Sequence, residues 1–160
     1  MANPSPSFST HGVILGDAKS RVLLAEDDSA FRSTMSLLLR SDGYDVVEVG
    51  DGSDALDELV RSLSDESSLR IFDVIITDVR MPGFSGMDVL RAVRGLPEAP
   101  PVILMTAFGN KETHREAHRL GALTVLDKPF DLDDLRTAVA NALSLRMLSE
   151  TDEGSDEPHS

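Results

Sequence analysis

The fold is decided by residues 72–87, which read Phe-Asp-Val-Ile-Ile-Thr-Asp-Val-Arg-Met-Pro-Gly-Phe-Ser-Gly-Met. Residues 74–77 are β-branched and contain no turn former, which predicts a central strand covered by helices on both faces. The strand ends at Asp78, and a loop with proline and glycine leads to a helix that begins near Ser85. Ligands of open parallel sheets bind beyond the carboxyl ends of the strands. Asp78 is therefore a candidate nucleophile or metal ligand, although many aspartates after a strand only cap a turn.

The composition describes an acidic, cysteine-free chain of 160 residues, long enough for one domain with a real core and terminal tails. The net charge of −13 argues against binding to nucleic acid or to an anionic membrane surface, because both attract lysine and arginine. The absence of cysteine excludes disulfides and thiol chemistry. Neither a secretory signal nor an apolar run long enough to span a bilayer is found, so we expect a cytoplasmic protein.

Two polar segments flank the expected domain. Residues 1–19 hold two prolines and one short apolar cluster, Val13-Ile14-Leu15, and are predicted to form a flexible extension. The cluster is either incidental or a docking segment for the domain or a partner. Residues 149–160 carry five acids and neither lysine nor arginine, which predicts a disordered tail. The folded domain is expected to span residues 20–148.

Short apolar runs alternate with amphipathic segments throughout the expected domain. The strands are expected at residues 21–25, 44–49, 74–77, 102–105 and 123–126. The helices are expected at residues 29–40, 53–63, 85–95, 110–120 and 131–147. Because each strand is followed by a helix, neighbouring strands pair in parallel through right-handed crossovers. The sequence therefore predicts an α/β fold, a three-layer sandwich with helices on both faces of a five-stranded sheet.

Polar side chains follow four of the five expected strands. Glu26 and Asp27 come after the first strand, Asp78 after the third, Thr106 after the fourth and Lys128 after the fifth. The carboxyl ends of parallel strands meet at one edge, so we expect these side chains to lie together. Neighbouring carboxylates repel one another, and next to a buried strand they need a cation to offset that repulsion.

This set of groups suits phosphoryl transfer to a carboxylate. Carboxylate oxygens are the ligands of a hard cation such as Mg²⁺, which also accepts a phosphate oxygen. One aspartate can act as the nucleophile and form an aspartyl phosphate. A lysine ammonium and a threonine hydroxyl can then hold the phosphoryl oxygens and neutralise the charge that develops.

Four motifs in this order resemble the receiver domain of a two-component response regulator, across residues 20–147. They are Val-Leu-Leu-Ala-Glu26-Asp27-Asp28, Ile-Ile-Thr-Asp78-Val-Arg-Met-Pro-Gly, Leu-Met-Thr106-Ala and Asp-Lys128-Pro-Phe. The resemblance implies a flavodoxin-like fold with the strand order 2-1-3-4-5. The stretch Thr106-Ala-Phe-Gly-Asn, with the later Gly121-Ala, is most similar to receivers of the nitrogen-regulation type. The usual ATPase and DNA-binding domains of those proteins are absent here, so we expect a single-domain receiver.

The resemblance also implies a Mg²⁺ site. Asp27 and Asp78 would bind the ion directly, together with the backbone carbonyl of Arg80. Glu26 would act largely through a water molecule. No other cofactor is implied.

The remaining roles concern the phosphoryl group. Asp78 would receive it from a sensor histidine kinase or a phosphotransfer protein, and Thr106 and Lys128 would contact it. The domain would then signal through a downstream protein target or relay the phosphate, catalysing only its own phosphorylation and dephosphorylation. Lys128-Pro129 would be a cis peptide. One position departs from the pattern, because Val125 stands where receivers often carry the aromatic residue of a rotameric switch.

Three alternatives bear on this interpretation. A haloacid-dehalogenase-like phosphatase also uses an aspartyl nucleophile, but it needs a second acid where Arg80 stands. A degenerate receiver would act only as a binding scaffold, and the intact set of polar residues argues against this alternative. His114 and His118 have a spacing that can chelate a metal on one helix face, but their charged neighbours favour a solvated face.

Overall fold

The computed structural model describes the backbone of residues 18–64 and 72–152 and the side chains of residues 18–64 and 72–148. Residues 1–17 of the expected extension (1–19) and residues 153–160 of the expected acidic tail (149–160) lie outside the described residues. So do residues 65–71. None of the described helices combines the length and apolar composition that crossing a membrane requires.

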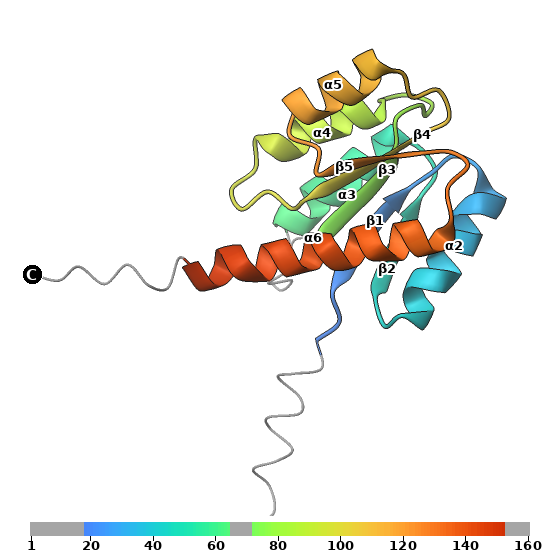
Figure 1. Ribbon diagram of the computed structural model, residues 1–160. Helices are drawn as coiled ribbons and strands as arrows, with labels where there is room; N and C mark the ends of the chain where they lie inside the picture. Colours follow the sequence, from blue (N-terminus) through green and yellow to red (C-terminus); the bar gives the residue numbers. More distant parts are fainter. Residues whose placement is uncertain (1–17, 65–71, 153–160) are drawn as a thin grey trace, which may run out of the picture.

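A five-stranded parallel sheet forms the centre of the domain (Figure 1). Its strands are β1 (Arg21–Ala25), β2 (Asp45–Val49), β3 (Val74–Asp78), β4 (Val102–Thr106) and β5 (Thr124–Asp127). They are arranged in the order β2-β1-β3-β4-β5, as predicted, and β2 and β5 are the edge strands. The register aligns Thr77 of β3 with Ala25 and Leu104 of its neighbours, so the carboxyl ends of the central strands lie level with one another.

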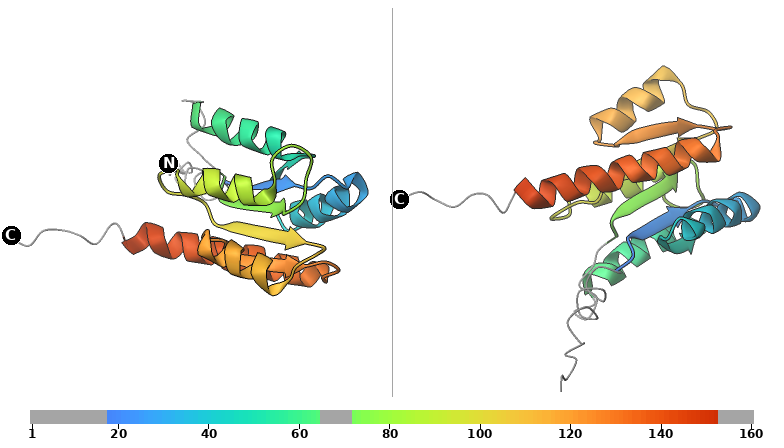
Figure 2. Two further views of the ribbon diagram at one scale, coloured as in Figure 1. Left: turned by 90° about the horizontal axis from the view of Figure 1, so that it is seen from above. Right: turned by 60° about the horizontal axis from the view of Figure 1, so that its bottom comes forward.

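Helices cover both faces of the sheet, which confirms the three-layer sandwich (Figure 2). They are α2 (Ser29–Ser41), α3 (Gly52–Ser64), α4 (Gly86–Arg94), α5 (Lys111–Arg119) and α6 (Leu132–Asp152). Buried residues of α2 and α6 pack on one face, and those of α3, α4 and α5 pack on the other. Each strand is followed by a helix that returns the chain to the opposite end of the sheet, as the sequence pattern requires.

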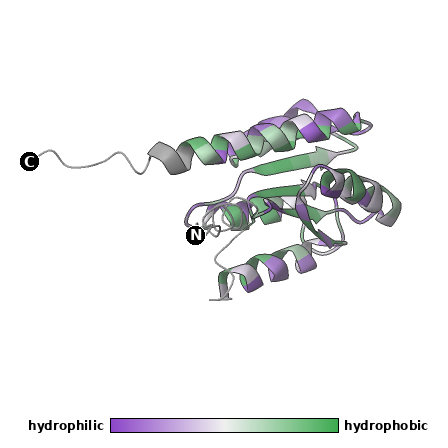
Figure 3. Cartoon of the chain, turned by 90° about the horizontal axis from the view of Figure 1, so that it is seen from below, coloured by the Kyte–Doolittle hydropathy of each residue, from purple (hydrophilic) through white to green (hydrophobic). Residues whose placement is uncertain are grey.

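The two cores arise from alternate residues of the same strands. Leu23 and Ile75 point into the core beneath α3 and α4, whereas Leu24 and Ile76 point into the core beneath α2 and α6. Every residue of β3 and β4 is buried. Each fully buried aliphatic side chain contributes roughly 1.5–3 kcal/mol, so this double burial holds the central strands in place. The hydropathy colouring shows the apolar strands between helices whose outer faces are more polar (Figure 3).

Local signals set where the helices begin. The side chain of Asp28 accepts a hydrogen bond from the Phe31 N–H and caps α2. Ser85 and Asp88 form a reciprocal capping box that starts α4, and such boxes satisfy otherwise unpaired N–H groups. The end of α6 differs from the expectation. This helix continues to Asp152, five residues beyond its expected end at residue 147, because neither glycine nor proline interrupts residues 130–153.

Candidate functional site

The predicted polar residues meet at the carboxyl edge of the sheet. Glu26 follows β1, Asp78 ends β3, Thr106 ends β4 and Lys128 follows β5. Glu26, Asp78 and Thr106 are all buried, and the exposed fraction of Glu26 is only 1%. Asp27 is exposed and lies at the mouth of the site. The sheet topology therefore gathers side chains that are far apart in the sequence into one site.

Lys128 bridges the two buried acids. Its Nζ atom lies 2.9 Å from Oε1 of Glu26 and 2.5 Å from Oδ2 of Asp78. The same ammonium group lies 5.0 Å from the centre of the Phe31 ring. From the sequence we predicted that a cation offsets the repulsion between the acids, and we assigned this role to a metal ion. In the structure the protein's own lysine also supplies positive charge to the acids.

Burial and charge shift the ionisation of this group of side chains. Burial, with a further contribution from the neighbouring Asp78, raises the pKa of Glu26 from 4.5 to about 7, despite the opposing effect of Lys128. Burial lowers the pKa of Lys128, but its hydrogen bonds to Asp78 and Glu26 outweigh that effect, and the pKa is raised overall. Lys128 therefore remains protonated, while Glu26 changes charge near neutral pH.

The acids fit a divalent cation. Glu26, Asp27 and Asp78 each offer a carboxylate oxygen, and these oxygens all lie within 4.8 Å of one another. Oε2 of Glu26 is buried and has no hydrogen-bond partner among the described residues. Buried polar atoms without a partner are rare and call for an explanation such as an ion or water. Oxygen ligands in this number and charge suit Mg²⁺.

The loop after β3 is held against Asp78 and against the start of α3. The Arg80 N–H donates to Oδ1 of Asp78 over 3.1 Å, which places the backbone of residue 80 beside the carboxylate. A side chain on Gly86 would collide with the carbonyl of Asp78, and one on Gly52 would collide with the carbonyl of Phe84. These close approaches require glycine. The loop that carries Arg80 is therefore firmly fixed.

The loop after β4 is held differently. Oγ1 of Thr106 accepts a hydrogen bond from the Phe108 N–H over 3.2 Å. The guanidinium of Arg80 stacks on the exposed ring of Phe108, 4.8 Å from its centre. Lys128 follows in the adjacent loop, with its N–H donating to the carbonyl of Thr106 over 2.8 Å and with the predicted cis peptide to Pro129. Side-chain contacts and the backbone hydrogen bond between Lys128 and Thr106 together position this part of the site.

The two histidines of α5 do not form a metal site together. Nε2 of His114 lies 2.8 Å from Oδ1 of Asp127, whereas His118 is exposed. The solvated-face interpretation therefore suits His118, and sequence reasoning missed the partner of His114. The side chain of Val125 is half-buried and packs against the core shared with α3, α4 and α5.

Comparison with known proteins matches residues 22–140 to the family described as response regulator receiver domain. The chain is 37% identical over 123 residues to the transcriptional regulatory protein ZraR of Escherichia coli O157:H7, covering 77% of this chain but only 26% of that protein. It is 30% identical over 126 residues to sporulation initiation phosphotransferase F of Bacillus subtilis. This second alignment covers 79% of this chain and 95% of the relative.

Solved structures show the same relationship. A response regulator receiver domain protein from Clostridium thermocellum superimposes with a TM-score of 0.71 and 29% identity, over 81% of this chain and 98% of that one. The chemotaxis response regulator CheY4 of Vibrio cholerae superimposes with a TM-score of 0.66 and 30% identity, over 79% of this chain and all of that one. The family match, the strand order and the acidic edge agree, and the chain belongs to the response regulator receiver domain family of two-component signalling.

Proposed function

We propose that this protein accepts a phosphoryl group on Asp78 in a Mg²⁺-dependent reaction and signals through protein contacts or relays the phosphate. The donor is a sensor histidine kinase or a phosphotransfer protein. The observation that carries the proposal is the position of the Asp78 carboxylate, which lies against the Lys128 ammonium and beside the unpaired oxygen of Glu26. Receiver domains bind Mg²⁺ through such acidic residues.

In the proposed reaction, a carboxylate oxygen of Asp78 attacks the phosphorus of the donor. An O–P bond forms to Asp78 as the P–N bond to the donor imidazole breaks, and the imidazole nitrogen keeps the electron pair. Lys128 pairs with one phosphoryl oxygen, and the hydroxyl of Thr106 donates to another. Glu26 and Asp27 would hold Mg²⁺ together with Asp78. The bound ion would supply positive charge that offsets the phosphoryl oxygens.

The backbone carbonyl of Arg80 completes the proposed metal site. Its contribution is supported by the short loop that brings the Arg80 N–H to the Asp78 carboxylate. Gly86, at the end of this loop, packs against the backbone of Asp78, and Gly52, at the start of α3, packs against the backbone of Phe84, so the loop has little room to shift. This rigidity is useful because Mg²⁺ demands near-octahedral geometry.

Two downstream routes are consistent with the relatives. One relative is called a phosphotransferase and is covered over 95% of its length, which supports phosphate relay by a receiver. Another is called a transcriptional regulatory protein, but this chain spans only 26% of it. We therefore assign the downstream partner only as a protein that distinguishes the phosphorylated from the unphosphorylated domain.

Acetyl phosphate with Mg²⁺ tests the proposal directly. We expect intact-mass measurement to show one added phosphoryl group, because the protein supplies the nucleophile and the small molecule replaces the kinase. Asp78→Asn should remove the label. Asp51→Asn is a matched control. Asp51 lies at the same edge of the sheet, after β2, but its side chain accepts a hydrogen bond from the Asp54 N–H at the start of α3 and is not one of the three clustered acids. Labelling that survives in the Asp78→Asn protein would refute the assignment of the nucleophile.

The same experiment separates the two alternatives. A wild-type protein that folds and binds Mg²⁺ but takes no label would instead be a phosphorylation-independent scaffold. A protein that continuously releases phosphate from unrelated phosphate esters would be a phosphatase. A receiver should release phosphate only from its own aspartyl phosphate.

A further inference from the structure

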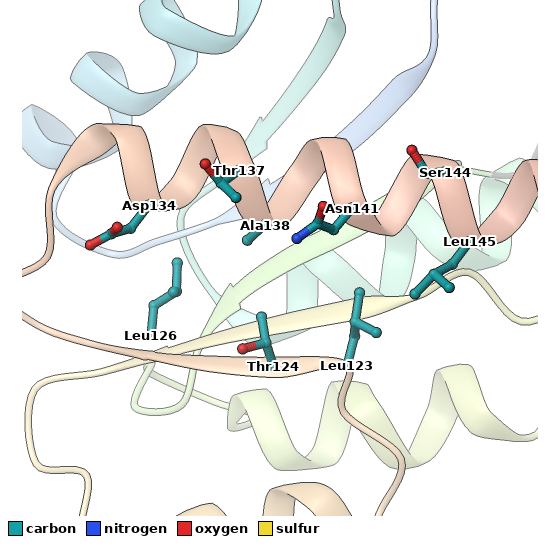
Figure 4. A pocket seen from close by; sticks show the side chains of 9 residues that line it. All are labelled: Leu123, Thr124, Leu126, Asp134, Thr137, Ala138, Asn141, Ser144 and Leu145. Carbon is teal, nitrogen blue, oxygen red and sulfur yellow. The ribbon is translucent and has the colours of Figure 1, made fainter.

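A groove of about 600 Å³ lies between the edge strand β5 and the helix α6 (Figure 4). The apolar side chains of Leu123, Leu126 and Leu145 line it, together with polar side chains of α6. In the described sheet β5 pairs with β4 alone, so its other edge has no neighbouring strand. An edge strand beside apolar pockets suits an extended peptide, whose side chains can enter the pockets.

The two ends of the groove differ in character. Figure 4 shows Asp134 near Leu126 at one end and Leu145 near Leu123 at the other. Asp134 is the one charged side chain among the described residues that line the groove. Leu145 is 51% exposed although it is a large aliphatic residue. An uncharged apolar segment therefore fits the Leu123–Leu145 end best.

The start of β1 lies close to that end of α6. The Arg21 N–H donates to Oδ2 of Asp73 over 2.7 Å. Oδ1 of the same aspartate lies 3.6 Å from Nε of Arg146, which follows Leu145 in α6. Arg146 also donates to the carbonyl of Phe72 over 3.3 Å. One aspartate therefore links the first residue of the sheet to the part of α6 that borders the groove.

The N-terminal segment is long enough to reach the groove. Leu15 precedes Arg21 by six residues, which span up to ~20 Å when extended. Strands β1 and β5 are separated by three strand spacings, or about 14 Å. Leu123, which directly precedes β5, lies at the same edge of the parallel sheet as Arg21. Residues 13–15 are therefore within reach of the Leu123–Leu145 end.

We propose that Val13, Ile14 and Leu15 fill the Leu123–Leu145 end of this groove, so that the chain covers its own edge. Residues 1–17 contain one acid, neither lysine nor arginine, and no other run of three aliphatic residues. A short tether raises the local concentration of the segment to the millimolar range, so a modest apolar contact is sufficient. The bound segment excludes a second copy or another partner from the β5–α6 face. This role is separate from the chemistry at Asp78.

The cysteine-free sequence allows a direct test on the full chain. Thr10→Cys carries a nitroxide spin label three residues before the cluster. We expect the amide signals of Leu123, Thr124 and Leu145 to lose most of their intensity compared with the reduced, diamagnetic label. Ile14→Asp should restore these signals, because burying an unpaired carboxylate is unfavourable. Ile14→Leu is the matched control and should leave the loss unchanged.

Two further measurements identify the occupant. In a mixture of isotope-labelled chains and separate spin-labelled chains, the signals of the isotope-labelled chains should remain intact. Signal loss in that mixture would mean that a second copy fills the groove, and it would overturn the proposal. Leu145→Asp should restore the intensities at Leu123 and Thr124 in the singly labelled chain. Equal intensity with active and reduced label, or a loss that persists in Ile14→Asp, would also overturn it.

Discussion

His114 and Asp127 form a pair, with 2.8 Å between Nε2 and Oδ1, that joins α5 to the end of β5. Gly109 lies directly against this pair. A Cβ atom on Gly109 would collide with Oδ1 of Asp127 and would lie 3.0 Å from Nε2 of His114. It would also lie 2.8 Å from Cγ2 of Thr106. The pair and the threonine therefore enclose the loop that has to move if Thr106 is to reach a phosphoryl group.

Replacing His114 by alanine should loosen that loop. We expect faster amide hydrogen exchange at residues 107–114, because the outer contact on Gly109 is lost. The cost in global stability should stay below about 1 kcal/mol, since the pair is partly exposed. His118→Ala is the matched control, because His118 lies on the same helix and is exposed. Equal exchange rates in both variants would show that the pair does not restrain the loop.

Magnesium should stabilise the protein in a pH-dependent way. The pKa of Glu26 is higher in the folded protein than its ordinary value of 4.5. The folded state therefore binds more protons between about pH 4.5 and 7, and this group adds stability as the pH falls. Mg²⁺ needs the ionised carboxylate and competes with that proton. The rise in melting temperature caused by Mg²⁺ should thus be larger at about pH 8 than at about pH 6.

Asp27→Ala provides the control for the magnesium effect. Asp27 is exposed, so its loss should leave the core intact while it removes one oxygen ligand. Its melting temperature without metal should be equal to or slightly above that of the wild type, because one repulsive charge is gone. Added Mg²⁺ should then have little effect. A full magnesium shift in this variant would argue against the proposed cluster.

Lys128→Met should make the fold depend on metal. Without the ammonium, Glu26 and Asp78 face each other with no internal cation, so the free energy of unfolding should fall. The fall should be smaller than the roughly 3–5 kcal/mol lost when a fully buried pair is broken, because Glu26 can take up a proton. Mg²⁺ should recover part of the loss in thermal melts. Lys111→Met, on the exposed side of α5, is the control and should melt like the wild type.

Thr106→Ala should separate phosphorylation from the conformational response. Asp78 should still accept a phosphoryl group, but no hydroxyl would draw the loop towards it. A ligand shifts a two-state element only through its different interactions with the two states. Amide chemical shifts with a beryllofluoride mimic should therefore change little beyond the site in this variant. Thr106→Ser should retain the response because it keeps the hydroxyl.

Val125→Ala should alter that response little. The side chain is short and β-branched, and such side chains are stiff at χ1. It is half-buried against the core and cannot sweep between two positions as an aromatic ring can. We therefore expect the β5 shifts to be small in the wild type as well. Large mimic-induced shifts around Val125 that persist in Thr106→Ala would contradict this mechanism.

Deleting residues 149–160 should leave labelling and melting temperature nearly unchanged, although α6 extends to Asp152. The helix is anchored before that point, because Arg146 contacts Asp73 and the Phe72 carbonyl. Arg146→Ala should cost on the order of 1 kcal/mol through these lost contacts. It should therefore lower the melting temperature more than the deletion does. The reverse order would place part of the folded core within residues 149–160.

The parallel sheet and the residues at its carboxyl edge were predictable because they depend on spacing along the chain, whereas the strand order was implied by the resemblance to receiver domains. Uniformly apolar runs in β3 and β4 indicate burial on both faces, and each is followed by its site residue. The parallel topology then brings Asp78 and Thr106 to one edge without further information. The glycine near the end of α4 likewise marked where that helix stops.

Contacts that depend on side-chain placement were not predictable. The link between His114 and Asp127 joins residues thirteen positions apart, and no local pattern signals it. The bridge from Lys128 to Glu26 crosses 102 positions, and a sequence shows only that both residues end at the same edge. The length of α6 was underestimated because composition favoured disorder where helix propensity still allowed another turn.

The loops after β3 and after β4, which border the site on two sides, differ in the contacts that limit substitution. Gly52 and Gly86 leave no room for a side chain against the backbones of Phe84 and Asp78, so a larger residue at either position would force the backbone to shift. In the loop after Thr106, Gly109 is confined by side chains, those of Asp127, Thr106 and His114, and the exposed ring of Phe108 contacts Arg80. Side-chain changes there can alter the exposed surface beside the site while the Asp78 carboxylate stays in place. New specificity can therefore arise on one side of the site without rebuilding the other.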